Sequence, residues 1–441
     1  MASKIITSKY SGDRLKEKSV YVYVDRNKLF INALVDSTRK YQEIIGFGGA
    51  FTEAAAVTLS KIDANLRNQV LGAYFDVDKG LGYNMGRIHI NSCDFALGNY
   101  TYVDEMDENL GSFSIEHDME YIIPLIKDAI IRRGAGIKLL ASPWSPPGWM
   151  KTNKDMNHGG SLLDEYKSTW ADYMVRFIKE YREAGLDIWG ITVQNEPEAV
   201  QSWDSCIFTG KEERDFVKSF LGPAMHDAGL GNVKIIIHDH NRDIILKRAG
   251  EILSDPGAAG YIWGTGFHWY VSEDFENVGK VHDMYPDKHL LFTEGCQEGG
   301  VHIGDWSVGE RYGRNIIGDM NNWCEGYLDW NIVLDEMGGP NHVGNYCDAP
   351  IICNTKEGKL HFNNSYYYIG HFSKYVKPGS RRIHSECNAE SIHLAAFETP
   401  EGMTVVVIMN EGDAETKLGV DVDGLYLQES IEPHSITTYI I

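Results

Sequence analysis

Stretches typical of buried strands alternate with helical stretches from residue 44 to residue 331, and this alternation constrains the fold more than any other feature. Alternating strands and helices predict a parallel sheet, because parallel neighbours need a long crossover connection. Two of the helical stretches, residues 114–133 and 161–184, are amphipathic. About eight strands in roughly 300 residues predict a closed (β/α)8 barrel, and a doubly wound open sheet is the alternative.

The pattern changes after about residue 370 to short β-rich runs separated by Gly, Asn and Asp turns, which is typical of a small antiparallel domain. Residues 19–35 have a similar composition, and two β-rich runs around Asp25-Arg26-Asn27 predict a hairpin that joins this domain. The expected division of the chain has three parts: residues 1–40 and 371–441 form an accessory β-sandwich, and residues 41–370 form the barrel.

The chain carries a formal net charge of −22 at pH 7. Nucleic acid binding requires a basic surface, so this acidity argues against a nucleic acid partner. Long-range repulsion likewise disfavours anionic membranes and anionic substrates. A neutral small molecule is therefore the expected ligand.

The N-terminal sequence MASKIITSKYSGDRLKEK contains no apolar run of the kind found in secretory signal peptides. Nowhere do 18 consecutive apolar residues predict a membrane-spanning helix. The seven cysteines are scattered and form no CxxC motif. We therefore expect reduced thiols in a cytoplasmic protein, rather than a disulfide framework or a zinc site.

Polar and aromatic residues gather at the carboxyl ends of the expected strands. In a parallel barrel these ends converge on one face, where different strands contribute to one site. The strand 188–193 ends at Asn195 and Glu196, and Pro197 stops further pairing because it has no N–H to donate. Backbone before a proline is irregular, so both side chains can turn towards one pocket. The residues at or just after strand ends are Asp94, Trp144, Asn195, Glu196, Asp239, His268, Tyr270, Glu294 and Trp330.

Two of these residues, Glu196 and Glu294, are carboxylates on strands that face each other across the expected barrel. Two carboxyl groups flanking a glycosidic bond suffice for glycoside hydrolysis, one as acid and base and the other as nucleophile. Aromatic walls suit the faces of a sugar, and Asn195 can donate to its 2-hydroxyl. Either carboxylate alone is compatible with a structural role, whereas the pair with the aromatic residues favours catalysis. Three further carboxylates are expected to be structural or to lie at the rim: Glu53, Glu298 and Glu336.

The histidines His238, His240 and His268, together with Asp239, raise the question of a metal site. Consecutive strand residues point to opposite faces, so residues 238–240 cannot all bind one ion. The chain has no HExxH motif and no His/Cys cluster. We therefore expect neither a catalytic metal nor another cofactor, and we expect His268 to hydrogen-bond the nucleophile or a neighbouring strand.

Several stretches together resemble the glucosylceramidase (acid β-glucosidase) family of retaining glycoside hydrolases, glycoside hydrolase family 30. The resemblance implies a (β/α)8 barrel and a β-sandwich built from both termini. The stretches follow the family's order between about residue 44 and residue 353: GFGGAFTEAA, RIHINSCDFALGNYTYVD, ASPWSPPGWMKTN, VQNEPEA, FHWY, LFTEGC and DWNIVLDEMGGPNHVGNYCDAPI.

The resemblance implies that Glu196 is the acid/base and Glu294 the nucleophile, the assignment that the strand ends already favour. It also implies that Arg87, His268 and Tyr270 support or contact the nucleophile. Asp239 is expected to be a supporting residue. The residues implied to contact the sugar, or to lie at the rim of its pocket, are Asp94, Trp144, Asn195, Tyr270, Trp330 and Asn345.

The resemblance further implies hydrolysis of β-glucosides, most directly of glucosylceramide-like compounds. Related β-xylosidases and β-1,6-glucanases have similar catalytic stretches, so these activities are alternatives. Mammalian lysosomal members carry a signal peptide and N-terminal disulfides, and this chain resembles a bacterial member that is cytoplasmic or non-classically secreted. A carbohydrate-binding protein without catalysis is an alternative of another class, and a missing carboxylate would be its signature.

Overall fold

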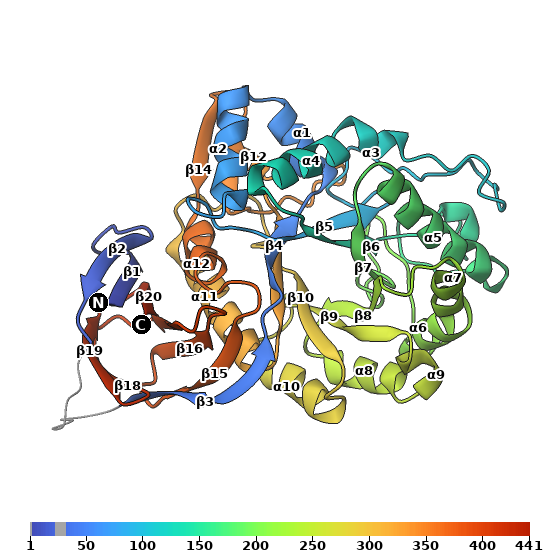
Figure 1. The fold of residues 1–441 in the computed structure, drawn as a ribbon. Helices are drawn as coiled ribbons and strands as arrows, with labels where there is room; N and C mark the ends of the chain where they lie inside the picture. The colour runs from blue at the N-terminus through green and yellow to red at the C-terminus, as the bar shows by residue number, and fades with distance from the viewer. Residues whose placement is uncertain (1, 23–31) are drawn as a thin grey trace.

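The computed structural model describes residues 2–22 and 32–441. Eight parallel strands close into a barrel in the order β10-β11-β4-β5-β6-β7-β8-β9, with helices packed around it (Figure 1). The predicted closed barrel is confirmed, and the open-sheet alternative is wrong. The barrel strands are β4 (Gly46–Ala50), β5 (Met85–Ile90), β6 (Lys138–Pro143), β7 (Ile188–Thr192), β8 (Lys234–Asn241), β9 (Ile262–His268), β10 (His289–Glu294) and β11 (Gly326–Asn331).

Helices fill the connections between the barrel strands and cover the outside of the barrel (Figure 1). One connection contains a π-helical turn, η3 (Val217–Leu221), between two α-helices. The α-helices are α1 (Glu53–Ser60), α2 (Ala64–Phe75), α3 (Glu116–Glu120), α4 (Ile122–Arg133), α5 (Lys167–Glu183), α6 (Gly210–Phe216), α7 (Gly222–Asp227), α8 (Ile245–Leu253), α9 (Pro256–Ala259), α10 (Phe275–Met284), α11 (Trp306–Asn321) and α12 (Asn364–Ser373). Among residues 2–22 and 32–441, no helix combines the length and the apolar composition that crossing a membrane requires.

Both predicted amphipathic helices differ from the observed ones at their starts. The helix expected over residues 114–133 is broken between α3 and α4, where Tyr121 has non-helical dihedral angles. Pro124 explains the break, because it has no N–H for the carbonyl of Glu120 and its ring crowds that carbonyl. The helix expected from residue 161 begins only at Lys167, after a 3₁₀ turn.

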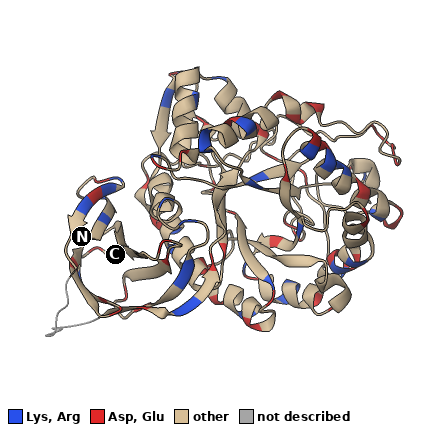
Figure 2. Cartoon of the chain, viewed as in Figure 1, with Lys and Arg blue, Asp and Glu red and all other residues tan. Residues whose placement is uncertain are grey.

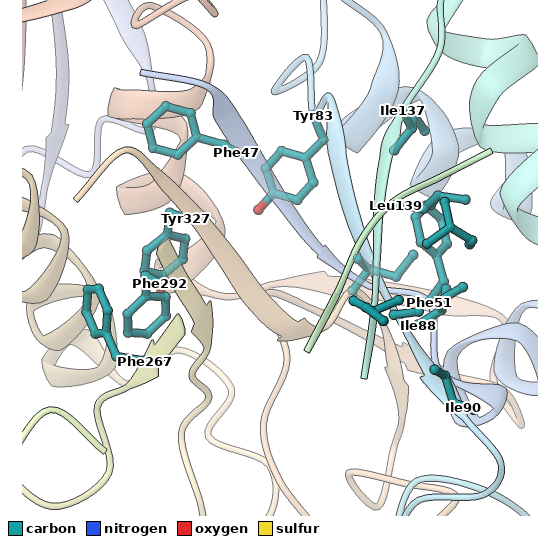
Figure 3. Packing of buried hydrophobic residues seen from close by; sticks show 14 of the residues in the cluster. Phe47, Phe51, Tyr83, Ile88, Ile90, Ile137, Leu139, Phe267, Phe292 and Tyr327 are labelled. Atoms are coloured by element: carbon teal, nitrogen blue, oxygen red, sulfur yellow. The ribbon is translucent and has the colours of Figure 1, made fainter. Parts of the chain in front are cut away.

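Side chains on the barrel strands alternate between an outer layer under the helices and the barrel interior. Phe267, Phe292 and Tyr327 lie together on three neighbouring strands (Figure 3), and the rings of Phe292 and Tyr327 stack with centroids 4.4 Å apart. A separate interior cluster is small and aliphatic apart from one methionine. Its buried members are Met85, Leu140, Ile236, Leu291 and Leu328.

The second domain is a nine-stranded sheet in the order β19-β18-β3-β15-β16-β17-β20-β1-β2. The sheet curls until its two ends share one core, in which Val20 of β2 and Leu427 of β19 are both buried. Both chain termini lie in this domain (Figure 1). Its strands are β1 (Ala2–Ser8), β2 (Lys16–Val20), β3 (Ala33–Glu43), β15 (Arg381–Cys387), β16 (Ile392–Glu398), β17 (Thr404–Asn410), β18 (Thr416–Val422), β19 (Leu425–Ile431) and β20 (Ser435–Ile440).

The predicted N-terminal hairpin needs correction, although the N-terminal strands do join the C-terminal ones. The expected turn at residues 25–27 lies outside the described residues. On either side of it, β2 pairs with β1, whereas β3 pairs with β15 and β18. Composition indicated that these runs are strands, but only packing in the whole sheet decides which strands are neighbours.

Helix α12 packs against both the barrel helix α11 and the nine-stranded sheet. His371 of α12 lies between β1 and β20, with its ring nitrogens 2.9 Å from the hydroxyl oxygens of Thr7 and Thr438. A small sheet of β12 (Leu334–Asp335), β13 (Ile351–Asn354) and β14 (Lys359–Phe362) extends from the barrel. Basic and acidic residues are interspersed over the barrel helices and over the sheet (Figure 2).

Candidate active site

A cavity of about 250 Å³ lies at the carboxyl ends of the barrel strands. Arg87, Asp239 and His268 are fully buried, and their hydrogen bonds reach the residues of its wall. The strand ends therefore converge as predicted. The predicted residues that line the cavity are Asp94, Trp144, Asn195, Glu196, Tyr270, Glu294, Trp330 and Asn345.

Irregular backbone brings several of these side chains to the cavity. Glu196, just after β7, has a φ of 45°, which is rare for a residue other than glycine. The register of β10 against β9 shifts between Phe292 and Glu294. Without this shift, strict alternation would direct Glu294 to the same outer face as Phe292. Both carboxylates thus depend on local departures from regular strand geometry.

Arg87, in the middle of β5, forms hydrogen bonds with three residues at the floor of the cavity. Its guanidinium donates to Glu294, to Asp239 Oδ2 at 2.8 Å and to Asn195 Oδ1 at 2.9 Å. Its carbon Cζ lies 4.9 Å from the ring centroid of Trp144. A buried cation thus balances two buried carboxylates, a balance that burial in an apolar interior demands.

Glu294 has both carboxylate oxygens held by donors. Tyr270 Oη donates to Oε1 at 2.9 Å, and Arg87 donates to Oε2. Burial raises the pKa of Tyr270 well above its usual value, so this phenol remains a donor at neutral pH. The carboxylate is therefore fixed in orientation at the cavity wall, where only 6% of the residue's surface is exposed.

His268 connects Glu196 with Asp239 of the neighbouring strand β8, so of the two predicted partners, the nucleophile and a neighbouring strand, the structure shows the second. Its Nδ1 lies 3.2 Å from Glu196 Oε1, and its Nε2 lies 3.1 Å from Asp239 Oδ1. Asp239 Oδ1 also accepts from Thr293 Oγ1 at 2.6 Å. The resulting chain of hydrogen bonds fixes the plane of the imidazole and directs Nδ1 at Glu196.

The charges around His268 determine where protons reside. Burial opposes a charged ring, but Glu294, Asp239 and Glu196 raise the pKa of His268 to about 9. Burial would also raise the pKa of Glu196, but the neighbouring imidazoles of His240 and His268 hold it below its usual range. The Glu196–His268 pair consequently carries one proton at neutral pH, and this proton resides on the histidine side.

Asp94 and two tryptophans form another wall of the cavity. Asp94 Oδ2 accepts hydrogen bonds from Asn345 Nδ2 at 2.9 Å and from Asn341 Nδ2 at 3.3 Å. Burial raises the pKa of Asp94 to about 7, although the bond from Asn345 opposes this shift. The rings of Trp144 and Trp330 stack with centroids 5.2 Å apart. An apolar wall beside polar acceptors suits a ring that carries several hydroxyl groups.

Two family descriptions together match nearly the whole chain. The glycosyl hydrolase family 30 TIM-barrel domain matches residues 44–376, and the family's beta sandwich domain matches residues 379–439. The chain belongs to glycosyl hydrolase family 30. The predicted family is thereby confirmed. The chain is also confirmed as an O-glycosyl hydrolase, and hydrolases of family 30 generally use a retaining mechanism.

Relatives of known name agree with this membership. Lysosomal acid glucosylceramidase of Mus musculus is 35% identical over 451 residues, which cover 97% of this chain and 87% of the relative. The crystal structure of SrfJ from Salmonella typhimurium has a TM-score of 0.96 and 35% identity, and the match covers 100% of this chain and 99% of that one. The endo-β1,6-glucanase BT3312 has a TM-score of 0.89 and 30% identity, with the same coverage.

In this family 30 chain, the cavity also includes residues that the strand-end argument missed. His240 lies on it because the register of β8 shifts between His238 and His240, so Asp239 and His240 both reach the site. The loop after β7 contributes Trp203, a residue without any strand-end signal. Phe95, His240 and Cys296 each stand within two positions of a predicted strand-end residue, and this proximity was the signal that the sequence offered. The additional lining residues are Phe95, Ala199, Gln201, Trp203, His240, Asn241, Cys296 and Cys347.

The three other carboxylates considered from the sequence lie in different surroundings. Glu53 accepts from the backbone N–H of Leu97 at 2.9 Å and lies 2.8 Å from His117 Nε2, which is a structural arrangement. Glu336 accepts from the backbone N–H of Thr355 at 3.0 Å. Glu298 lines the cavity, as expected for a residue at the rim.

Proposed function

We propose that this family 30 hydrolase is a retaining β-glucosidase that acts on glucosylceramide-like β-glucosides, with Glu294 as nucleophile and Glu196 as acid/base. The arrangement of the two carboxylates supports the proposal most strongly. Glu294 is held by Arg87 and Tyr270, whereas Glu196 is held by a histidine that can carry a proton. The surroundings of Glu294 suit a nucleophilic carboxylate, and the histidine beside Glu196 suits a proton donor.

In the first half of the proposed reaction, a Glu294 oxygen attacks the anomeric carbon and forms a glycosyl ester. The bond from this carbon to the leaving oxygen breaks, and the leaving oxygen takes a proton through Glu196. In the second half, Glu196 accepts a proton from water, the water oxygen attacks the anomeric carbon, and the ester bond to Glu294 breaks. Two inversions give net retention.

The proton for the leaving oxygen comes from the Glu196–His268 pair in this proposal. Glu196 faces the cavity, while His268 is fully buried behind it. The imidazole therefore supplies the pair's proton through Glu196 and does not reach the substrate itself. Asp239, on the far side of the ring, stabilises the imidazolium until the transfer occurs.

This proton supply predicts an alkaline limb in the pH profile. Because the neighbouring carboxylates raise the pKa of His268 to about 9, the pair keeps its proton below that pH and loses it above. For an alkyl β-glucoside, kcat/KM is expected to fall about tenfold per pH unit above pH 9, since kcat/KM reports the free enzyme. A 2,4-dinitrophenyl β-glucoside, whose leaving group needs no proton, serves as the control and should show no such limb. A limb of equal steepness for both substrates would contradict this proton supply.

The stereochemical outcome and the substrate range test the proposed function directly. A proton NMR time course with an aryl β-glucoside should show the β-anomer of glucose first, followed by mutarotation. Initial release of the α-anomer would exclude the double displacement. In a panel of aryl β-glucoside, aryl β-xyloside, β-1,6-glucan and glucosylceramide, we expect the glucosides to give the highest kcat/KM. Binding without turnover across the panel would favour the non-catalytic alternative.

Hydrolysis of β-1,6-glucan is the second candidate, because the similar BT3312 is an endo-β1,6-glucanase. The cavity favours the first candidate. Its volume of about 250 Å³ is below the roughly 300–1,000 Å³ of pockets for drug-sized ligands, so it suits one sugar ring with the leaving group outside. Internal cleavage of a pustulan chain, detected as long oligosaccharides at early times, would favour the glucanase instead.

A further inference from the structure

A second histidine lies beside the proposed acid/base. His240 Nδ1 is 3.8 Å from Glu196 Oε1, and His268 Nδ1 is 3.2 Å from the same oxygen. One ligand atom from each of these three residues lies within 4.8 Å of the other two. Neither the hydrolytic steps above nor the hydrogen bonds of the cavity floor require His240, so this arrangement needs another explanation.

The distances suit a tetrahedral metal ion. Zinc binds imidazole nitrogen at about 2.0–2.1 Å and carboxylate oxygen at about 2.0–2.2 Å, so neighbouring ligand atoms of a tetrahedral site lie about 3.4 Å apart. The two distances to Glu196 lie on either side of this value. The His240 side chain is 12% exposed and lies at the cavity wall. Two imidazoles and one glutamate form a ligand set that zinc enzymes use.

The surroundings of His268 provide a second, independent observation. Its Nε2 lies 3.1 Å from the Asp239 carboxylate, which leaves Nδ1 directed at the cluster. Metal-binding histidines are commonly oriented in this way by a carboxylate on their other nitrogen. The nearby Asp239 and Glu196 carboxylates also favour positive charge at this position. A divalent cation bound by the cluster benefits from the same charges.

The cluster is also accessible. Glu196 and His240 both line the cavity, so an ion can enter from solvent and keep a water molecule as its fourth ligand. The same cavity is lined by Asp94, Glu294 and Glu298, whose acidic groups favour the entry of cations.

We propose that Glu196, His240 and His268 form an inhibitory site for a zinc-class divalent cation. The bound ion occupies the Glu196 oxygen and the His268 Nδ1 that faces it. The leaving oxygen of a glycoside then has no proton donor, and the enzyme is inactive until the ion dissociates. The inhibitory part rests on the proposed role of Glu196, whereas the binding part rests only on the geometry of the three side chains.

Direct binding is tested with Co²⁺, whose visible absorption reports four-coordinate sites without any need for activity. We expect one Co²⁺ per chain, displaced by Zn²⁺. His240→Ala and the more conservative His240→Gln should each weaken binding at least tenfold. His226→Ala removes a histidine whose side chain is 79% exposed, and this control should bind as the unchanged protein does. Unchanged affinity in both folded His240 variants, or absence of four-coordinate absorption in the unchanged protein, would overturn the site.

Inhibition is tested separately, relative to the metal-free rate of each variant. Zn²⁺ should inhibit hydrolysis of an aryl β-glucoside at the concentrations at which it displaces Co²⁺, and a chelator should restore the rate. The His240 variants should need at least tenfold more Zn²⁺ for the same fractional loss. Metal binding at His240 with full activity would refute inhibition but not the site. Absence of any hydrolysis in metal-free protein would instead refute the proposed function.

Discussion

Replacing Glu294 with glutamine is expected to lower kcat for an aryl β-glucoside on the order of 10⁵-fold, the scale seen when a covalent nucleophile is removed. The amide keeps the shape of the side chain and its contact with Tyr270, but it is too weak a nucleophile to form the glycosyl intermediate. Steady-state kinetics measures the loss, and thermal unfolding checks that the variant is folded.

Two comparisons make this test specific. Glu298→Gln changes another carboxylate that lines the same cavity, and it should alter kcat less than tenfold because Glu298 is not the proposed nucleophile. Azide added to Glu294→Ala can enter from the side that the carboxylate vacated, so the expected product is the α-glucosyl azide. Activity of Glu294→Gln near that of the unchanged protein, or formation of the β-azide by Glu294→Ala, would contradict the assignment.

The second large effect is expected from Glu196→Ala, and it should depend on the leaving group. General acid catalysis contributes about 10²–10⁴-fold, so kcat/KM for a phenyl β-glucoside should fall about 10³-fold. For 2,4-dinitrophenyl β-glucoside, glycosylation needs no proton and should remain fast. The glycosyl intermediate then accumulates, because Glu196 is absent for the second half, and a burst of dinitrophenol reports it.

Azide distinguishes this role from that of Glu294. In Glu196→Ala the ester to Glu294 is still formed, so azide attacks from the face opposite to that ester and gives the β-glucosyl azide. The rate with dinitrophenyl glucoside should rise with azide concentration. Equal losses for both leaving groups, with no azide effect, would show that Glu196 is not the acid/base.

The barrel and its strand ends were predictable because their signals are local. Each buried strand shows its own run of apolar residues, and Pro197 marks the end of one strand without reference to any other. Because the strands are parallel, their carboxyl ends lie on one face of the barrel. The eight strand ends, each recognisable from its own segment, therefore place Glu196 and Glu294 on that face. The helix start at Lys167 was not predictable in this way, since the preceding Leu162 instead pairs with Lys151 in a β-bridge.

Pairing within the N-terminal region shows a second limit. The observed strands Lys16–Val20 and Ala33–Glu43 overlap the predicted β-rich stretch 19–35 only at residues 19–20 and 33–35. Their neighbours come from elsewhere in the chain: β3 lies between β18 and β15, and β2 lies beside β1. Sequence proximity favours a hairpin through its low loop-closure entropy, but the shared core of the curled sheet outweighs this preference.

By itself, the sequence determined alternating strands and helices, a β-rich second region and two carboxylates at strand ends, because apolar periodicity and strand-ending residues are properties of each segment alone. Only the tertiary structure decided which partners those carboxylates have. The register shift in β8 brings His240 to Glu196, and the position of β9 directs His268 at Glu196 rather than at Glu294. These contacts join residues 44 and 72 positions apart in the sequence, so no local pattern encodes them.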